Sequence, residues 1–140
     1  MKKTIILFFV AIAMISCNTS KQAVTAEMLN GEWKIISVNG QTVKTNENQT
    51  APFLNIDMQK NRVSGSTGCN RLTGGVNVDL DKSSFSFDDK MASTRMMCPD
   101  MTVEQSVLEA MQQVQSFNIN KKGLLVLTDN EGKVKMTLSK

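Results

Sequence analysis

Apolar and polar residues alternate over much of this chain from residue 32 onward. Leu54, Ile56 and Met58, for example, are separated by Asn55 and Asp57, which is the period-two pattern of a strand with one buried face. Alternating segments of this kind, and short apolar runs bounded by turn residues, predict strands. The expected strands cover residues 32–38, 54–58, 62–65, 76–80, 84–88, 117–119, 124–128 and 134–138.

Turn residues separate these strands at short intervals. Asn39-Gly40 suits the two central positions of a type I′ hairpin turn. Gln59-Lys60-Asn61 predicts a second turn, and Asp129-Asn130-Glu131-Gly132 predicts a hairpin loop near the end of the chain. Such short connections favour antiparallel neighbours.

One segment changes to the period of a helix. Between Val103 and Gln115 the apolar residues fall on one helical face. Thr102 with Gln105 three residues later has the form of a capping box, and Glu104 suits the positive end of the helix dipole. We expect an α+β fold, mostly β: an antiparallel, strongly curved, open barrel-like sheet of seven to eight short strands packed around this amphipathic helix. Trp33, the only tryptophan, is expected in the core.

The first residues have the pattern of an export signal. Lys2 and Lys3 precede the apolar run Ile5–Ile15, which is shorter than the roughly 20 residues that span a bilayer. The run ends in Met14-Ile15-Ser16-Cys17, which resembles a bacterial lipobox, where cleavage leaves the cysteine as the lipid-modified first residue. The alternative is an ordinary secretory signal with a chance cysteine at its end.

This interpretation divides the chain into three parts. We expect a lipoprotein signal peptide at 1–16, a flexible tether at 17–28 that begins with lipidated Cys17, and a single domain at 29–140. The formal charge of +3 falls to +1 when the two leader lysines are removed. A domain so close to neutral lacks the basic surface of a nucleic-acid binder, so we exclude nucleic acid as a partner.

Export also determines what the other two cysteines are expected to do. Cys69 and Cys98 would meet an oxidising compartment, which predicts a disulfide. The two cysteines are 29 positions apart, and closing a loop of this length stabilises a domain by about 3.5 kcal/mol in the chain-entropy description. Two buried thiols or a metal pair are the alternatives.

Few residues suggest catalysis. The chain has no histidine, which excludes Ser-His-Asp and Cys-His arrangements and the imidazole ligand of most metal sites. Asp88 and Asp89 are expected to be solvated turn residues. One cluster of sulfur residues could supply soft ligands for Cu(I): Met91, Met96, Met97, Cys98 and Met101. Methionine also fills irregular cores, and we expect no bound metal or cofactor.

Two arginines flank the cysteine motifs. Arg71 follows Cys69 closely and Arg95 precedes Cys98. A bridge between the cysteines would bring the two motifs together, which predicts a possible partner surface that includes both arginines. Ordinary surface charge is the alternative.

Several short motifs and their order along the chain resemble the META domain, a family that includes the HslJ-like heat-shock lipoproteins of bacteria. The resemblance covers roughly residues 29–138. It rests on Leu29-Asn30-Gly31-Glu32-Trp33, Val38-Asn39-Gly40, Val63-Ser64-Gly65 with Gly68-Cys69-Asn70 and Gly74, Ser93-Thr94-Arg95-Met96-Met97-Cys98, and Leu125-Val126-Leu127.

The resemblance implies a compact β-rich domain, often anchored in the envelope and linked to heat stress or antibiotic tolerance. We expect a non-enzymatic lipoprotein, held at the outer membrane through Cys17 and facing the periplasm. Its expected partners are the membrane and an unknown envelope protein, as an interaction module in stress tolerance. The alternatives are a binder of a small hydrophobic ligand and a protease inhibitor acting through one open end of the sheet.

Overall fold

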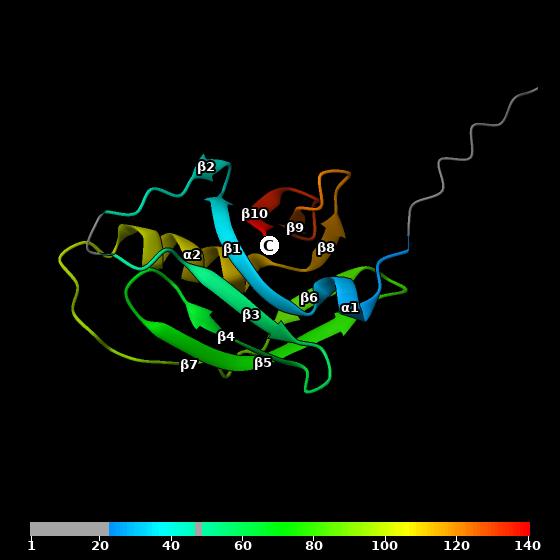
Figure 1. Ribbon diagram of the computed structural model, residues 1–140, viewed down its shortest axis with the longest axis horizontal. Helices are drawn as coiled ribbons and strands as arrows, with labels where there is room; N and C mark the ends of the chain where they lie inside the picture. The colour runs from blue at the N-terminus through cyan, green and yellow to red at the C-terminus, as the bar shows by residue number, and fades with distance from the viewer. Residues whose placement is uncertain (1–22, 47–48) are drawn as a thin grey trace, which may run out of the picture.

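A computed structural model describes residues 23–46 and 49–140 of the chain (Figure 1). The expected signal peptide, Cys17 and residues 18–22 of the expected tether lie outside these residues. The elements in chain order are α1 (Ala26–Leu29), β1 (Gly31–Val38), β2 (Gln41–Thr42), β3 (Phe53–Asp57), β4 (Arg62–Ser66), β5 (Arg71–Asp79), β6 (Ser84–Phe87), β7 (Ala92–Ser93), α2 (Thr102–Gln113), β8 (Ser116–Ile119), β9 (Leu125–Thr128) and β10 (Val134–Ser139).

Eight of the described strands form an antiparallel sheet in the order β1-β3-β4-β5-β6-β8-β9-β10. The sheet closes into a barrel because β10 also pairs with β1, with Ile35 opposite Leu138. The two-residue strands β2 and β7 pair with β1 and β5. The predicted α+β, mostly β fold is confirmed, and closure gives β1 and β10, the two end strands of a curved sheet, a neighbour on each side.

The interior of the barrel is filled by apolar side chains. Trp33 and Phe85 are the largest fully buried residues, and Leu54, Leu127 and Leu138 are also completely buried. Most inward-facing strand positions are those that the period-two patterns predicted; in β10 the prediction is wrong at two positions, because Val134 is 39% exposed and Lys135 is buried. The remaining buried apolar residues are Leu29, Ile35, Val38, Ile56, Val63, Leu72, Val76, Val107, Ala110, Met111, Val114, Phe117, Leu125 and Met136.

Helix α2 contributes one face to this core. It lies against β10, β6 and β1, as Figure 1 shows for β1 and β10, and it buries Val107, Ala110 and Met111. Neither helix in residues 23–46 and 49–140 has the length and hydropathy that a membrane span requires.

The packed domain includes a short helix upstream of the first strand. Leu29, at the end of α1, is fully buried. The indole Nε1–H of Trp33 donates a hydrogen bond to the Leu29 carbonyl over 2.7 Å. Trp33 is 1% exposed, so the prediction of a core tryptophan is confirmed. The helix begins at Ala26, three residues before the expected start of the domain.

The expected hairpin turn after β1 is present. Asn39 has φ of 49° and Gly40 has φ of 79°, which are the two left-handed residues of a type I′ turn. Val38 pairs with Gln41 across it.

Candidate functional site

A disulfide joins the two cysteine motifs, as predicted. Cys69 follows β4 and Cys98 precedes α2, and their Cα atoms lie 6.1 Å apart. The bridge closes a loop with a sequence separation of 29 residues. The alternatives of buried thiols and a metal pair are therefore wrong in this structure, and Cys98 has no thiolate for a soft metal.

Glu104 lies beneath the disulfide in the first turn of α2. It is 5% exposed. One carboxylate oxygen, Oε2, accepts hydrogen bonds from the backbone N–H of Cys69 at 3.2 Å and of Asn70 at 2.7 Å. The other, Oε1, accepts one from the side-chain amide of Asn70 at 2.7 Å. The helix is thus fastened to the loop between β4 and β5.

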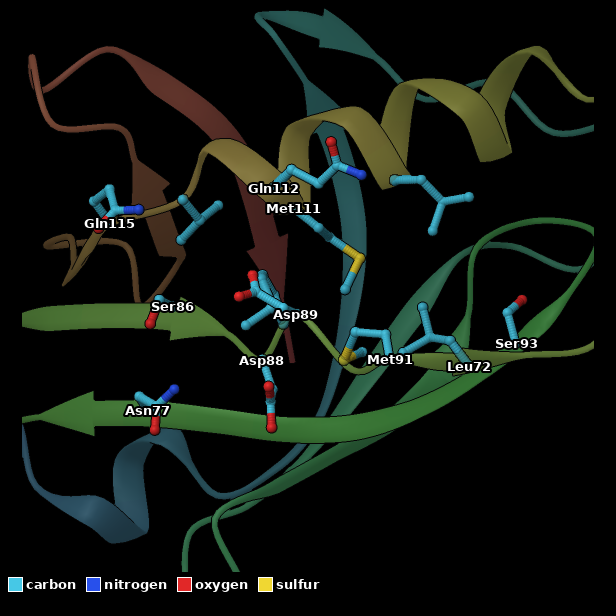
Figure 2. Close-up of a pocket in the computed structure, with 13 residues that line it drawn as sticks. Leu72, Asn77, Ser86, Asp88, Asp89, Met91, Ser93, Met111, Gln112 and Gln115 are labelled. Atoms are coloured by element: carbon cyan, nitrogen blue, oxygen red, sulfur yellow. The ribbon is translucent and has the colours of Figure 1, made fainter.

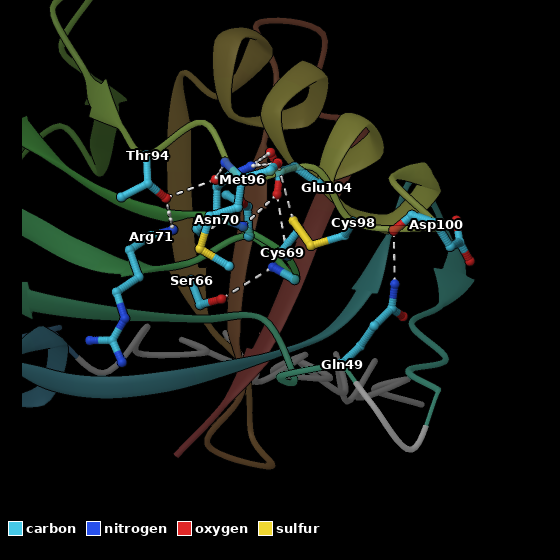
Figure 3. The surroundings of a disulfide bond; sticks show 12 residues. Gln49, Ser66, Cys69, Asn70, Arg71, Thr94, Met96, Cys98, Asp100 and Glu104 are labelled. Atoms are coloured by element: carbon cyan, nitrogen blue, oxygen red, sulfur yellow. Dashed lines mark hydrogen bonds between the residues drawn. A yellow bond between two sulfur atoms is a disulfide. The ribbon is translucent and has the colours of Figure 1, made fainter.

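The side chain of Asn70 connects this loop to a third segment (Figure 3). Its Oδ1 accepts from the Thr94 hydroxyl at 2.8 Å and from the Met96 N–H at 2.6 Å. Its Nδ2 donates to the Met96 carbonyl at 3.3 Å as well as to Glu104. All four hydrogen-bonding positions of the amide are used, so one side chain holds together the loop between β4 and β5, the segment around Thr94 and Met96, and the start of α2.

We call this network the hub: Cys69, Asn70, Thr94, Met96, Cys98 and Glu104. Burial raises the pKa of Glu104, but the hydrogen bonds from Asn70, together with those from Thr67 and Cys69, outweigh it and hold the pKa below its ordinary value. A carboxylate that is ionised and fully occupied by N–H donors is suited to structural work and poorly suited to proton transfer.

The loop before the hub depends on a special backbone conformation. Gly68 has φ of +120°, which L side chains rarely adopt. Thr67 is fully buried, and its hydroxyl donates to the Asn70 carbonyl at 3.1 Å. This turn aims the N–H groups of Cys69 and Asn70 at Glu104.

The outer surface of the hub exposes two methionines. Met97 is 99% exposed and Met96 is 58% exposed, although large apolar side chains elsewhere in the described chain are mostly covered. The backbone of Arg71 is hydrogen-bonded to Thr94, two residues before Met96. The Thr94 N–H donates to the Arg71 carbonyl at 3.0 Å, and the Arg71 N–H donates to the Thr94 hydroxyl at 3.1 Å. Arg71 and Arg95 are both exposed. We call Arg71, Arg95, Met96 and Met97 the methionine–arginine face.

A groove lies between α2 and the β5–β6–β7 side of the barrel (Figure 2). Its volume is about 680 Å³. Figure 2 shows Asp88, Asp89 and Met91 between the helix that carries Met111 and Gln112 and the strand that carries Asn77. The groove is lined by Leu72, Asn77, Ser86, Phe87, Asp88, Asp89, Met91, Ser93, Leu108, Met111, Gln112, Val114 and Gln115.

The disulfide removes the thiolate ligand from the soft-metal site that the sequence suggested. The Cys98 sulfur is bonded to Cys69, Met91 packs against the core, and Met97 is in solvent. Within residues 23–46 and 49–140, histidine, cysteine, aspartate and glutamate side chains also form no group of three or more that could hold a metal ion.

The sequence profile of the META domain matches residues 26–140. This chain belongs to the META domain family. Comparison with curated proteins gives no match.

Two solved structures share the fold of this META domain. A protein from Burkholderia xenovorans, solved by NMR, has a TM-score of 0.62 and 17% identity, over 99% of this chain and 97% of that one. A crystal structure of a DUF4847 family protein from Bacteroides vulgatus has a TM-score of 0.54 and 12% identity, over 80% of this chain and 93% of that one. At these identities the likeness concerns the fold alone.

The prediction of a capping box at the start of α2 in this META domain is wrong. Thr102 makes no side-chain capping bond; it lies inside α2, and the residue at the cap position is Met101. Asp100 instead accepts a hydrogen bond from the Thr102 N–H at 2.9 Å. The start of the helix is positioned by tertiary contacts, because Glu104, the third residue of α2, is hydrogen-bonded to Cys69 and Asn70.

Sequence reasoning also missed Asn70 and Glu104 as the centre of the site. A signal for Glu104 was present: it lies on the same helical stripe as Val107, Leu108 and Met111, where an acidic residue must be paired once it is buried. Asn70 carried no such signal beyond its position next to Cys69.

Proposed function

We propose that this META domain is a non-enzymatic interaction module of the cell envelope, active in heat or antibiotic stress tolerance. The proposal includes a lipid anchor at Cys17 that holds the domain at the outer membrane, facing the periplasm. The leader and its lipobox-like end support the anchor and the location.

The observation that carries the interaction role is the exposure of Met97 on a braced segment. A side chain that is 99% exposed normally belongs to a loose loop, yet this one is adjacent to a disulfide and to a backbone held by Asn70. Docking an already ordered segment avoids the entropy cost of ordering it on binding. Methionine adapts its shape to irregular apolar pockets.

The chemistry of the partner follows from the same face. Arg95 directly precedes the methionines in the chain, and Arg71 is hydrogen-bonded through its backbone to Thr94 beside them. Neither arginine is in an ion pair within the described chain. A rim of arginine around an apolar centre is the usual arrangement of a protein interface. The fitting partner is an envelope protein that presents an apolar pocket with acidic residues at its edge.

Support for a non-catalytic role comes from how the polar groups are used. Asn70 and Glu104, which are both buried, use their hydrogen-bonding groups mainly on each other and on the backbone. The chain contains no histidine. The acidic residues of the groove, Asp88 and Asp89, are exposed.

Site-specific crosslinking in the native cell tests the proposal. A photoactivatable phenylalanine analogue at Met97 should capture one defined envelope protein, more strongly during heat stress. The matched position is Gln59, exposed in the turn between β3 and β4, which should not capture it. Identical products from both positions would contradict the proposal.

A charge-reversal pair separates specific docking from simple exposure. Arg71→Glu with Arg95→Glu should abolish the product from Met97 and the stress tolerance of the cell while the domain stays folded. Lys121→Glu with Lys122→Glu makes the same charge change at exposed residues of another turn and should leave both intact. Full tolerance with the arginine pair reversed would refute the role of this face.

A second candidate function is binding of a small ligand, because the groove has a volume typical of ligand sites. The filled barrel interior means that such a ligand would occupy the groove. Native mass spectrometry of protein extracted from membranes tests this, since a co-purifying mass of constant value would favour a carrier.

A further inference from the structure

The strand ladder of the barrel stops early on one side of β6. Ser84 of β6 pairs with Ser116 of β8. Beyond that pair, the Phe85 N–H donates to the Gln115 carbonyl at 3.1 Å. Upstream of Gln115 the chain turns into helix α2 at Val114, so β8 does not continue alongside the end of β6.

This leaves part of the β6 edge without a neighbouring strand. The Asp88 N–H donates to the Gly75 carbonyl of β5 at 2.9 Å. Backbone groups alternate in direction along an antiparallel strand, so those of Ser86 and Asp88 point toward β5. The N–H and C=O of Phe87 therefore point the other way, like the N–H of Phe85.

The groove runs along this edge. Ser86, Phe87 and Asp88 all line it, although successive residues of a strand alternate between its two faces. A cavity touched from both faces of one strand lies at the edge of that strand. The opposite wall is the last part of α2, with Met111 and Gln112.

The edge continues into β7. Both β6 and β7 pair with the same side of β5: Phe87 lies opposite Val76, and Ser93 lies opposite Leu72. Because the Thr94 N–H is directed at Arg71, alternation directs the backbone of Ser93 outward. Ser93 also lines the groove, which thus offers main-chain pairing groups at two points.

The charge of the lining is one-sided. Asp88 and Asp89 are the only charged residues among those that line the groove. Both are exposed, and no ion pair within the described residues includes them. Apolar surface lies beside them at Met91, Phe87 and Leu72.

We infer that the groove binds an extended basic peptide segment of a partner protein, which adds a strand to the edge of β6 at Phe87. Main-chain hydrogen bonds to Phe87 and Ser93 would supply affinity, as in other cases of strand addition. Lysine or arginine side chains of the segment would face Asp88 and Asp89. Its alternate apolar side chains would pack on Met91 and Met111. This site is separate from the methionine–arginine face.

A defined probe tests the inference without knowledge of the natural partner. The probe is a fluorescent, acetylated heptapeptide of alternating lysine and valine, added to the mature full-length chain with its disulfide intact. Fluorescence polarisation should show saturable binding. In ¹⁵N–¹H correlation spectra, the amide signals of Phe87 and Ser93 should shift on addition of the peptide.

Two peptide controls separate strand pairing from charge attraction. A peptide with the same sequence but N-methylated at every residue keeps the side chains and loses all of its N–H donors on both edges, so it should not bind. A glutamate–valine peptide should not bind either. Equal binding of the N-methylated peptide would overturn strand addition, and absence of binding by the lysine–valine peptide would overturn the inference as a whole.

Variants of the protein locate the site. Asp88→Asn with Asp89→Asn keeps side-chain size and the hydrogen bond from the Lys90 N–H to Asp88, and should weaken binding about fivefold at low salt. Asp81→Asn with Glu131→Gln removes the same charge from exposed residues outside the groove and should have no effect. An equal loss in both would assign the binding to net charge alone. These results are independent of crosslinking at Met97, so either proposal can fail without the other.

Discussion

Glu104 accepts hydrogen bonds from both the backbone N–H and the side-chain amide of Asn70, each over 2.7 Å. The two residues are 34 positions apart in the chain, so the contact exists only in the folded state. It joins the first turn of α2 to the loop between β4 and β5, directly beneath the disulfide. The methionine–arginine face is held in place by this pair.

Replacing Glu104 by glutamine should destabilise the domain by about 2 kcal/mol, because an NH₂ group would then face N–H donors that are buried. Urea unfolding followed by tryptophan fluorescence measures this. Glu109→Gln changes an exposed glutamate of the same helix and should alter the unfolding free energy by less than about 0.5 kcal/mol. Equal effects of the two substitutions would refute the role of Glu104 in the hub.

Acid should weaken the fold through the same carboxylate. The pKa of Glu104 is raised by burial but held below its ordinary value of 4.5 by the hydrogen bonds it accepts. A depressed pKa in the folded state contributes stability above the ordinary pKa, and this contribution is lost as the pH falls below 4.5 toward the folded-state pKa. Melting temperatures measured down to strongly acidic pH should therefore decline below that point.

The Glu104→Gln variant supplies the comparison for this pH dependence. Its melting temperature should decline less steeply, because its remaining acid sensitivity comes from other carboxylates. One of these is Asp129. Burial raises its pKa, but hydrogen bonds from Lys133 and Lys135 outweigh burial and hold the pKa below its ordinary value. Parallel pH profiles for wild type and variant would show that Glu104 is not the responsible group.

Removing the disulfide with Cys69→Ser and Cys98→Ser should cost about 3.5 kcal/mol, the chain-entropy value for a loop of this length. Guanidinium unfolding with and without reductant measures the loss. The unfolding free energy of the wild type should fall when the disulfide is reduced, whereas that of the double variant should be the same with and without reductant. A wild-type protein unchanged by reduction would mean that the hydrogen bonds of Asn70 alone hold the loop.

Two strand glycines should respond differently to alanine. A Cβ on Gly65 would collide with the backbone carbonyl of Phe53, whereas a Cβ on Gly75 would meet only the side chain of Asp88, at 3.1 Å from a carboxylate oxygen and 3.3 Å from its Cβ. Gly65→Ala should therefore cost about 2–3 kcal/mol and Gly75→Ala less than about 1 kcal/mol. Similar losses of unfolding free energy for the two variants would show that β3 and β4 can separate to admit the methyl group.

Pattern alone predicted most of the barrel strands and the main helix, because the periods of strands and helices are local properties. Leu54 and Ile56 are buried in β3 and Asn55 between them is exposed, as alternation required. The type I′ turn at Asn39-Gly40 was predictable for the same reason. Strands β2 and β7 have only two residues each, which is too short to show a period, and the single turn of α1 is equally brief.

Pairings between distant segments were beyond the reach of local patterns. Nothing in the sequence of β10 specifies that it pairs with β1 and so closes the sheet. The groove arises where β8 gives way to α2 beside β6, which is a consequence of the path of the chain in space. The partners of Glu104 lie on another element for the same reason.

The sequence by itself determined most of the strand residues that face the core and where the chain turns, and it favoured a disulfide between Cys69 and Cys98. Only the tertiary structure decided that the sheet closes, that Asn70 and Glu104 meet, and that Phe87 is left at an open strand edge. Side-chain periodicity is set by neighbours along the chain. Contacts across the barrel depend on how all the strands fit together around one core.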